Sequence, residues 1–308
     1  MYIIDISDPV NPVETGFFPT KTAADGLTIR DTLAYVAGGD NGFLIINVSD
    51  PANPRLTGSL SNIGYVDDIS LRDSLAYVAT GYLGGKGHFR IINIADPANP
   101  RETVSIEFPG EAYDLAVSGR YAYVGGIMGL RIIDISNPAS PNEVGSYKGD
   151  YSPFGVALAG NYVYAACGFS RMHILDVTDP AHPVEAGSSD WGGWSFTLAL
   201  TGDFLYLPTN YMGLGIFNIS DPINPLVAGA YEIGNAFGVT CANNLVYVTE
   251  YDFGLYIIRN DLQTGINNKY GSANPDIILE SNFPNPFSTV TNIKLYHSGE
   301  QFCQIDCI

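Results

Sequence analysis

One short pattern occurs six times in this chain of 308 residues and limits its fold more than any other feature. The pattern is an aliphatic run, then Asp or Asn, then a polar turn with two prolines, as in "LIINVSDPANP" (44–54) and "RIIDISNPASP" (131–141). The residue that opens the turn recurs every 41 to 46 positions, at Asp5, Asn47, Asn93, Asp134, Asp176 and Asn218. A period of this length indicates an array of similar supersecondary units.

Each unit predicts four short β-strands. In the first full unit they are "GLTI" (26–29), "AYVA" (34–37), "LIINV" (44–48) and "RLTGSL" (55–60), which are rich in β-branched and aromatic residues and separated by turn residues. The third strand is apolar on both faces and must be covered on both sides. Four strands per ~42 residues, stacked radially, make a β-propeller.

We therefore predict an all-β fold, with a propeller over residues 1–261. Six blades are favoured, with "NPVETGFF" (11–18) completing the last blade as its fourth strand, because this closure pairs more strand edges. The alternative is a ring of seven positions, two of them partial.

We interpret the repeated turn as scaffold. Asp and Asn alternate at its first position, and a metal-binding or catalytic carboxylate cannot be exchanged for an amide. Both residues offer an acceptor oxygen to the turn backbone. The first proline presets φ, and the second opens the outermost strand, where a missing N–H breaks no ladder.

The charge of the chain excludes several classes of function. There are 14 basic and 32 acidic residues, for a net charge of −18, so no basic face for nucleic acid can be assembled. No apolar stretch reaches the ~18 residues of a membrane span. The four cysteines lack metal-type spacing, and we expect no metal and no cofactor.

Variation between the units points to one face of the ring. Loops between strands four and one share this face with loops between strands two and three, and function is expected where loops vary on a constant frame. The position just before the first strand is occupied by Asp25, Asp67, Tyr113, Phe154, Phe196 and Phe237, and the next position by Gly26, Asp68, Asp114, Gly155, Thr197 and Gly238. Half of the ring mouth is therefore predicted to be acidic and half aromatic.

A ligand site is predicted at this mouth. We expect Trp191 and Trp194, the only tryptophans, in a loop between strands four and one, where both indoles can turn toward one ligand. Aromatic rings beside carboxylates suit a glycan or a peptide. The candidate residues are Trp191, Trp194, Tyr113, Tyr151, Tyr211, Tyr251, Asp67, Asp68, Asp114 and Glu111. Because Phe154, Phe196 and Phe237 recur at one register, we expect them to pack between blades.

The alternative is a hydrolase or lyase acting on glycans or lactones. Asp67, Asp68, Asp114 and Glu111 would then supply a carboxylate pair at an acidic channel mouth. Histidine gives little support to catalysis, because His173 and His182 fall on repeat positions and His88 has no dedicated partner visible in the sequence. We favour a non-catalytic binding module.

The repeated words, "FLIINVSDPANP" and "LRIIDISNPASP" above all, resemble the LVIVD repeat of bacterial and archaeal extracellular proteins. The resemblance covers residues 1–261. It implies a secreted or cell-surface propeller and no established common activity.

A second resemblance lies in "IILESNFPNPFSTVTNIKLY" (277–296), which is similar to the C-terminal sorting domain of type IX secretion in Bacteroidetes-like bacteria. It implies export by the type IX machinery in the full-length parent. Residues 262–276 are polar and turn-rich and are predicted to be a linker, and 277–308 a partial sorting domain. No signal peptide precedes the first strand, and the sorting domain stops before its usual final strand, so we expect the sequence to be a fragment.

Overall fold

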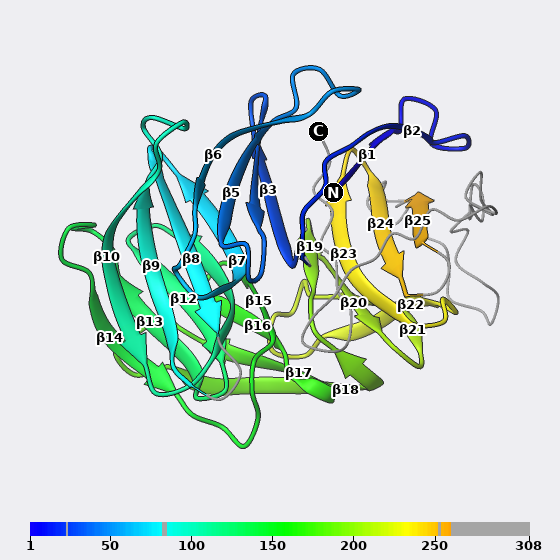
Figure 1. Ribbon diagram of the computed structural model, residues 1–308. Coiled ribbons are helices and arrows are strands. Elements are labelled where there is room, and N and C mark those ends of the chain that lie inside the picture. Colours follow the sequence, from blue (N-terminus) through cyan, green and yellow to red (C-terminus); the bar gives the residue numbers. More distant parts are fainter. Residues whose placement is uncertain (23, 82–84, 252–253, 260–308) are drawn as a thin grey trace.

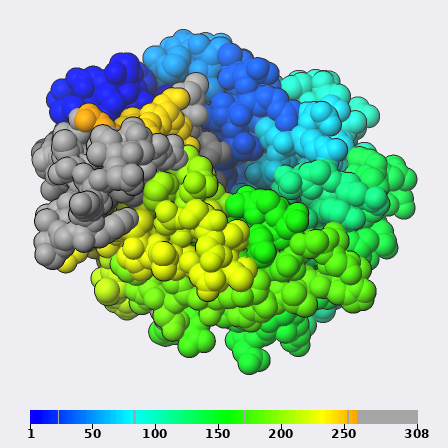
Figure 2. Space-filling view, turned by 180° about the vertical axis from the view of Figure 1, so that it is seen from behind, coloured from blue at the N-terminus to red at the C-terminus, as the bar shows by residue number. Residues whose placement is uncertain are grey.

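The computed structural model describes residues 1–22, 24–81, 85–251 and 254–259. Every regular element among these residues is a β-strand, and the strands form sheets arranged radially around an axis (Figure 1). In the space-filling view the colours follow chain order around the molecule, from blue through cyan and green to yellow (Figure 2). The predicted all-β propeller is confirmed. The proposed linker and sorting domain, residues 262–308, lie outside the described residues.

Six blades follow one another in chain order, and neighbouring strands within each are antiparallel. Blade 1 holds β3 (Gly26–Arg30), β4 (Leu33–Ala37), β5 (Phe43–Asn47) and β6 (Arg55–Leu60). Blade 2 holds β7 (Tyr65–Arg72), β8 (Leu75–Gly81), β9 (Gly87–Asn93) and β10 (Arg101–Phe108). Blade 3 holds β11 (Ala112–Ser118), β12 (Tyr121–Gly126), β13 (Gly129–Asp134) and β14 (Asn142–Tyr147).

The remaining blades continue the series. Blade 4 holds β15 (Gly155–Ala159), β16 (Tyr162–Ala166), β17 (Gly168–Asp176) and β18 (Val184–Ser195). Blade 5 holds β19 (Ala199–Thr201), β20 (Phe204–Thr209), β21 (Gly213–Asn218) and β22 (Leu226–Tyr231). Blade 6 has three strands among the described residues, β23 (Ala236–Ala242), β24 (Leu245–Glu250) and β25 (Gly254–Arg259).

The hydrophobic core lies between the blades. A tyrosine of the second strand is buried in every blade and packs toward the next one, as Tyr35 of blade 1 does with Val66 and Ile69 of blade 2. The equivalent residues are Tyr77, Tyr123, Tyr164, Tyr206 and Tyr247. Third strands are buried on both faces, as Ile45 and Ile46 show. Each blade is thus covered on both sides by its neighbours, which explains the doubly apolar third strand.

The N-terminal hairpin occupies its own place in the ring. Its strands β1 (Tyr2–Asp5) and β2 (Val13–Phe17) pair with each other in a separate two-stranded sheet. Ile4 packs against Tyr247 and Leu255 of blade 6, whereas Ile3 packs against the core of blade 1. The hairpin therefore lies between blades 6 and 1. We expected residues 11–18 to complete blade 6, but β2 pairs with β1, and this arrangement buries the two faces of β1 against different blades.

The side chains of the repeated turns make structural contacts, within the turn and with the preceding blade. The opening Asp or Asn accepts a hydrogen bond from the backbone N–H two residues later in all six copies, as Asp176 does from Thr178 at 2.8 Å and Asn218 from Ser220 at 2.8 Å. The second Asp or Asn of the turn does the same, as Asp179 does from Ala181 N–H at 3.0 Å, and the other carboxylate oxygen of Asp179 lies 2.9 Å from His182 Nδ1. The turn also packs on the preceding blade, where Gly187 leaves no room for a Cβ beside Ile223. Carboxylate and amide oxygens thus accept the same turn hydrogen bond.

Candidate functional site

The face that carries the candidate site is formed by two kinds of loop. First strands of consecutive blades contact one another, so they lie innermost around the axis. The tight hairpins between second and third strands, and the loops from the fourth strand to the next first strand, open on the same side. We call this side the hairpin face. The proline turns lie on the opposite side.

Four aromatic rings follow one another around the inner edge of the hairpin face. Tyr113 stacks on Phe154 at a centroid distance of 4.8 Å, Phe154 meets Phe196 edge-on at 5.3 Å, and Phe196 stacks on Phe237 at 5.9 Å. These residues come from the starts of the first strands of blades 3 to 6 and are half-buried. We call them the aromatic arc. They pack between blades, as expected, and they do so as one continuous row.

Large apolar side chains stand exposed at the hairpins just outside this arc. They are Ile127 (46% exposed), Phe169 (71%), Tyr211 (74%), Met212 (50%) and Tyr251 (50%). Ile127, Tyr211, Met212 and Tyr251 lie in the hairpins between second and third strands of blades 3, 5 and 6, and Phe169 is the second residue of β17, at the equivalent hairpin of blade 4. We call these five residues the hairpin tips. Tyr251 touches Phe237 at 5.8 Å, and Trp194 joins Phe169 (4.3 Å) to Phe196 (5.7 Å). The exposed tips Phe169 and Tyr251 are therefore continuous with the aromatic arc.

Carboxylates complete the inner edge at blades 1 and 2. Both oxygens of Asp25 are buried, and the side chain of Tyr65 lies beside them. Burial raises the pKa of Asp25 to about 7, an increase that the nearby Tyr65 hydroxyl partly offsets and Asp40 augments. Asp67 accepts a hydrogen bond from Gly81 N–H at 2.6 Å, and burial, Asp25 and Glu111 raise its pKa well above the usual range. The charges acting on this pair are those of other carboxylates.

Asp68 and Asp114 form a buried pair that links three blades. Asp68 Oδ2 accepts from Leu115 N–H at 3.1 Å, and Asp114 Oδ2 accepts from Val156 N–H of blade 4 at 2.6 Å. Burial raises the pKa of both carboxyls, and the charge of Asp68 raises that of Asp114 further, because two buried carboxyls joined by a hydrogen bond favour holding one proton between them. Gly26 makes room for Asp68, since a Cβ there would lie 2.8 Å from its Oδ1. These carboxyls face backbone between blades.

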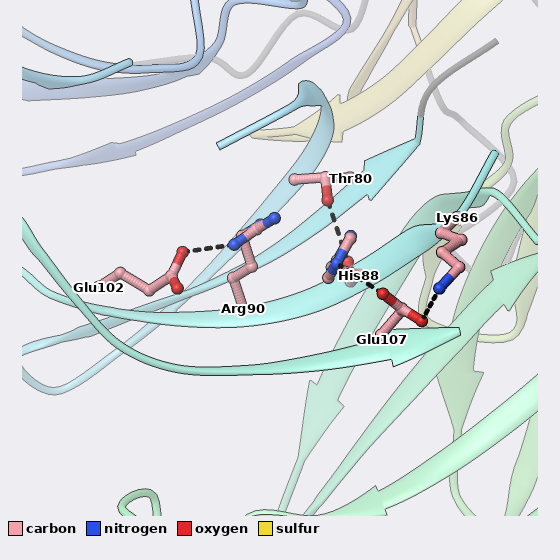
Figure 3. Close-up of polar contacts among 6 residues, drawn as sticks. All are labelled: Thr80, Lys86, His88, Arg90, Glu102 and Glu107. Carbon is pink, nitrogen blue, oxygen red and sulfur yellow. Dashed lines mark hydrogen bonds and ion pairs between the residues drawn. The ribbon is translucent and has the colours of Figure 1, made fainter. Parts of the chain in front are cut away.

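A pair of oppositely charged or polar side chains recurs between the third and fourth strands of blades 2, 3 and 4. Arg90 binds Glu102 in blade 2 (Figure 3), and Arg131 binds Glu143 at the same register of blade 3. In blade 4 the pair is His173 Nδ1 and Glu185 Oε1, 2.8 Å apart. His173 thus takes a scaffold position, as expected. His88, for which the sequence suggested no partner, lies 3.9 Å from Glu107, which also binds Lys86 (Figure 3).

Tyr151 covers this blade 4 pair. Its ring stacks on His173 with centroids 3.4 Å apart, and its hydroxyl lies 3.5 Å from Glu185. Phe108 of blade 2 covers Arg131 in the same manner, with the guanidinium 4.9 Å from the ring centroid. Tyr151 therefore repeats a packing contact between consecutive blades.

The two tryptophans lie within the long strand β18, and the loop expected around them is the end of that strand. Trp191 packs edge-on against Phe217 of blade 5 at 5.6 Å, and a Cβ on Gly215 would lie 2.7 Å from its indole. Gly215 occupies the register of Arg90, Arg131 and His173, so the indole fills space that a side chain fills in other blades. Trp194 instead joins the rings of Phe169 and Phe196. The two indoles have different neighbours.

The structure thus divides the ten candidate residues. Tyr113, Trp194, Tyr211 and Tyr251 lie in or beside the aromatic arc and hairpin tips, and Glu111 accepts the hydroxyl of Tyr113 at 2.8 Å. Asp67 is part of the inner acidic edge. Asp68, Asp114, Tyr151 and Trp191 bind or pack against the next blade.

Sequence reasoning missed three hairpin tips, Ile127, Phe169 and Met212. Their common signal is an apolar residue inside a two-to-three hairpin, where blade 1 has "GGDNG" (38–42). Within the described ranges, no group of three or more His, Cys, Asp or Glu is placed to hold a metal ion. The same residues include no helix that is long and apolar enough to cross a membrane.

Comparison with known proteins agrees with this architecture. The family described as "LVIVD repeat" matches residues 1–20, 23–61, 63–107, 109–149, 154–190 and 192–232. No curated protein is similar enough to count as a match.

Solved structures share the fold at low sequence identity. The β-propeller domain of Myceliophteria thermophila Cps50 (Swd1) has a TM-score of 0.61 and 13% identity, covering 78% of this chain and 84% of that one. Saccharomyces cerevisiae Sqt1 has a TM-score of 0.61 and 12% identity, with 80% and 74% covered. The computationally designed protein Ika8 has a TM-score of 0.54 and 10% identity, with 78% and 84% covered.

Proposed function

The chain belongs to the LVIVD-repeat family of β-propellers, and we propose that it is a binding module that holds its ligand on the hairpin face. The observation that carries this proposal is the set of exposed apolar tips on four consecutive blades. Tyr211 and Phe169 expose about three quarters of their surface. Single exposed apolar residues are common, but a group of large ones at equivalent positions marks an interaction surface.

The tips also have the composition of a binding hot spot. Tyrosine supplies broad contact area with few rotatable bonds, and methionine adapts to irregular surfaces. Behind them, the aromatic arc provides a firm base, because each ring is packed against the next. A catalytic role finds less support. The buried carboxyl pair Asp68 and Asp114 accepts hydrogen bonds from backbone between blades.

The proposal can be tested by screening the intact chain against a glycan array and a phage-displayed library of random dodecapeptides. Ligands that use this face should bind the Tyr211→Ala/Tyr251→Ala double variant at least tenfold more weakly. The matched control is Leu226→Ala/Val227→Ala, which removes two other exposed apolar side chains, at the start of β22 on the opposite side. Ligands that bind both variants equally well would place the binding site elsewhere.

We also propose that the module acts outside the cell or at its surface. Support comes from the LVIVD family and from the similarity of residues 277–296 to type IX sorting domains. Cell fractionation of the source organism tests it: recovery only from the cytoplasm would contradict the proposal.

A further inference from the structure

We propose that the partner of the hairpin face is a protein segment in extended conformation that carries lysine or arginine between apolar residues. This inference rests on the proposed function and specifies the chemistry of its ligand. The apolar tips of the face indicate the apolar residues of the partner, and the charge of the face indicates its basic residues.

The apolar half follows from the spacing of the tips. Ile127, Phe169, Tyr211 with Met212, and Tyr251 stand on blades 3, 4, 5 and 6, and each is separated from the next by the width of a blade. A compact apolar ligand can touch one or two of these tips. An extended chain, which advances ~3.3 Å per residue, can reach several tips in succession. A segment with spaced apolar residues therefore fits the arc.

The charged half follows from the acidic sector that closes the same ring. Asp25 and Asp67 are buried at the inner edge of blades 1 and 2, so the carboxylate that a partner can reach there is Asp40, exposed at the hairpin of blade 1. Glu232 adds an exposed carboxylate in the loop that leads into blade 6. Among the bases of this face, Lys86 pairs with Glu107 and Arg171 with Asp190, whereas Lys21 and Lys148 are exposed in loops. A cation from a partner would find both carboxylates and aromatic rings here.

Charge complementarity favours this partner over a neutral glycan. The chain carries a net charge of −18, so an acidic or neutral ligand gains nothing from the field of the protein, whereas a basic segment is attracted and oriented by it. Glu232 lies in the loop that joins blade 5 to blade 6, between the tips Tyr211 and Tyr251 along the chain, and Asp40 lies on blade 1, on the other side of the N-terminal hairpin from blade 6. A basic residue within the segment can therefore pair with Glu232, and one at its end with Asp40.

The dodecapeptide selection tests the inference. Clones that lose at least tenfold in affinity on Tyr211→Ala/Tyr251→Ala should be enriched in Lys and Arg beside apolar residues. Their binding should also fall about threefold to tenfold on Asp40→Asn/Glu232→Gln, and this loss should shrink at high salt because the charges are exposed. The matched control is Asp31→Asn/Asp203→Asn, which removes two exposed carboxylates on the opposite side.

The other outcomes separate this inference from the proposed function. Clones that need the tips but show no enrichment in basic residues would overturn the inference and leave the binding face intact. A neutral glycan that binds in a tip-dependent manner while no peptide does would have the same effect. If neither peptides nor glycans depend on the tips, both proposals fail.

Discussion

The indole of Trp191 lies directly over Gly215, so that a Cβ on this glycine would be 2.7 Å from the ring. One residue supplies the volume that the other lacks, across the boundary between blades 4 and 5. We expect Trp191→Ala to lower the free energy of unfolding by ~2–4 kcal/mol, because the cavity cannot be filled from Gly215. Urea unfolding measures this loss. Trp194→Ala is the internal comparison, and it should cost less while weakening ligand binding. Equal and small losses would show that Trp191 is not needed for packing.

The repeated turns should tolerate exchange of Asp for Asn. Asp176→Asn keeps the oxygen that accepts from Thr178 N–H, so its stability should stay within ~0.5 kcal/mol of the parent. Asp176→Ala and Asn218→Ala should each cost ~1 kcal/mol, since both leave a turn amide without its acceptor. Asp134 is less informative because Arg120 also binds it. A much larger loss for Asp176→Asn than for Asn218→Ala would mean that the charge matters.

Asp25 should make the protein less stable as pH rises. Burial raises its pKa in the folded protein from 3.8 to about 7, so the folded state binds this proton more tightly than the unfolded state does. The stabilising contribution is complete below pH ~4 and is lost as pH rises through about 7. Asp25→Asn should therefore raise the free energy of unfolding by ~1–3 kcal/mol at pH 8 and change it little at pH 4. Asp203→Asn, on the opposite side, serves as the control. A variant that is no more stable at pH 8 than at pH 4, relative to the parent, would show that Asp25 is charged and satisfied.

Because Asp68 and Asp114 share a proton, we expect Asn and Ala at position 114 to affect stability differently. Asn at position 114 can still donate to Asp68 and accept from Val156 N–H, so Asp114→Asn should change stability by less than ~1 kcal/mol at pH 7. Asp114→Ala leaves both partners unsatisfied and should cost ~2–3 kcal/mol. Thermal and urea unfolding of the two variants give the comparison. If Asn proves as costly as Ala, the carboxyls do not share a proton.

The fold was predictable from the sequence because comparing the repeats shows which residues are constant and which vary. Six copies of the turn showed which features are constant, and an acceptor oxygen at Asp176 or Asn218 was recognisable from the alternation alone. The acidic and aromatic halves of the mouth were likewise predictable, since Asp67 and Phe196 occupy one register.

Other features depend on contacts between repeats, which a single unit does not reveal. Trp191 breaks the repeat and therefore suggested a ligand site, yet it compensates for a glycine 24 positions later in the next blade. The hydrogen bond from Val156 to Asp114 also crosses a blade boundary. Phe169 and Met212 were overlooked because an apolar residue in a short hairpin looks the same in sequence whether it folds inward or stands in solvent.

The placement of the N-terminal hairpin gives the ring a built-in seam. Consecutive blades are joined by the chain itself, whereas among the described residues the hairpin forms a sheet of its own that does not pair with β25, and its Ile4 and Ile6 pack against Tyr247, Leu255 and Ile257 of blade 6. Local opening of the ring should therefore begin there, and amide exchange in β1 and β25 should be faster than in the third strands of blades 1 to 5. A partner that touches both Tyr251 and Asp40 would bridge blades 6 and 1. Its binding would therefore raise the free energy needed to open the ring.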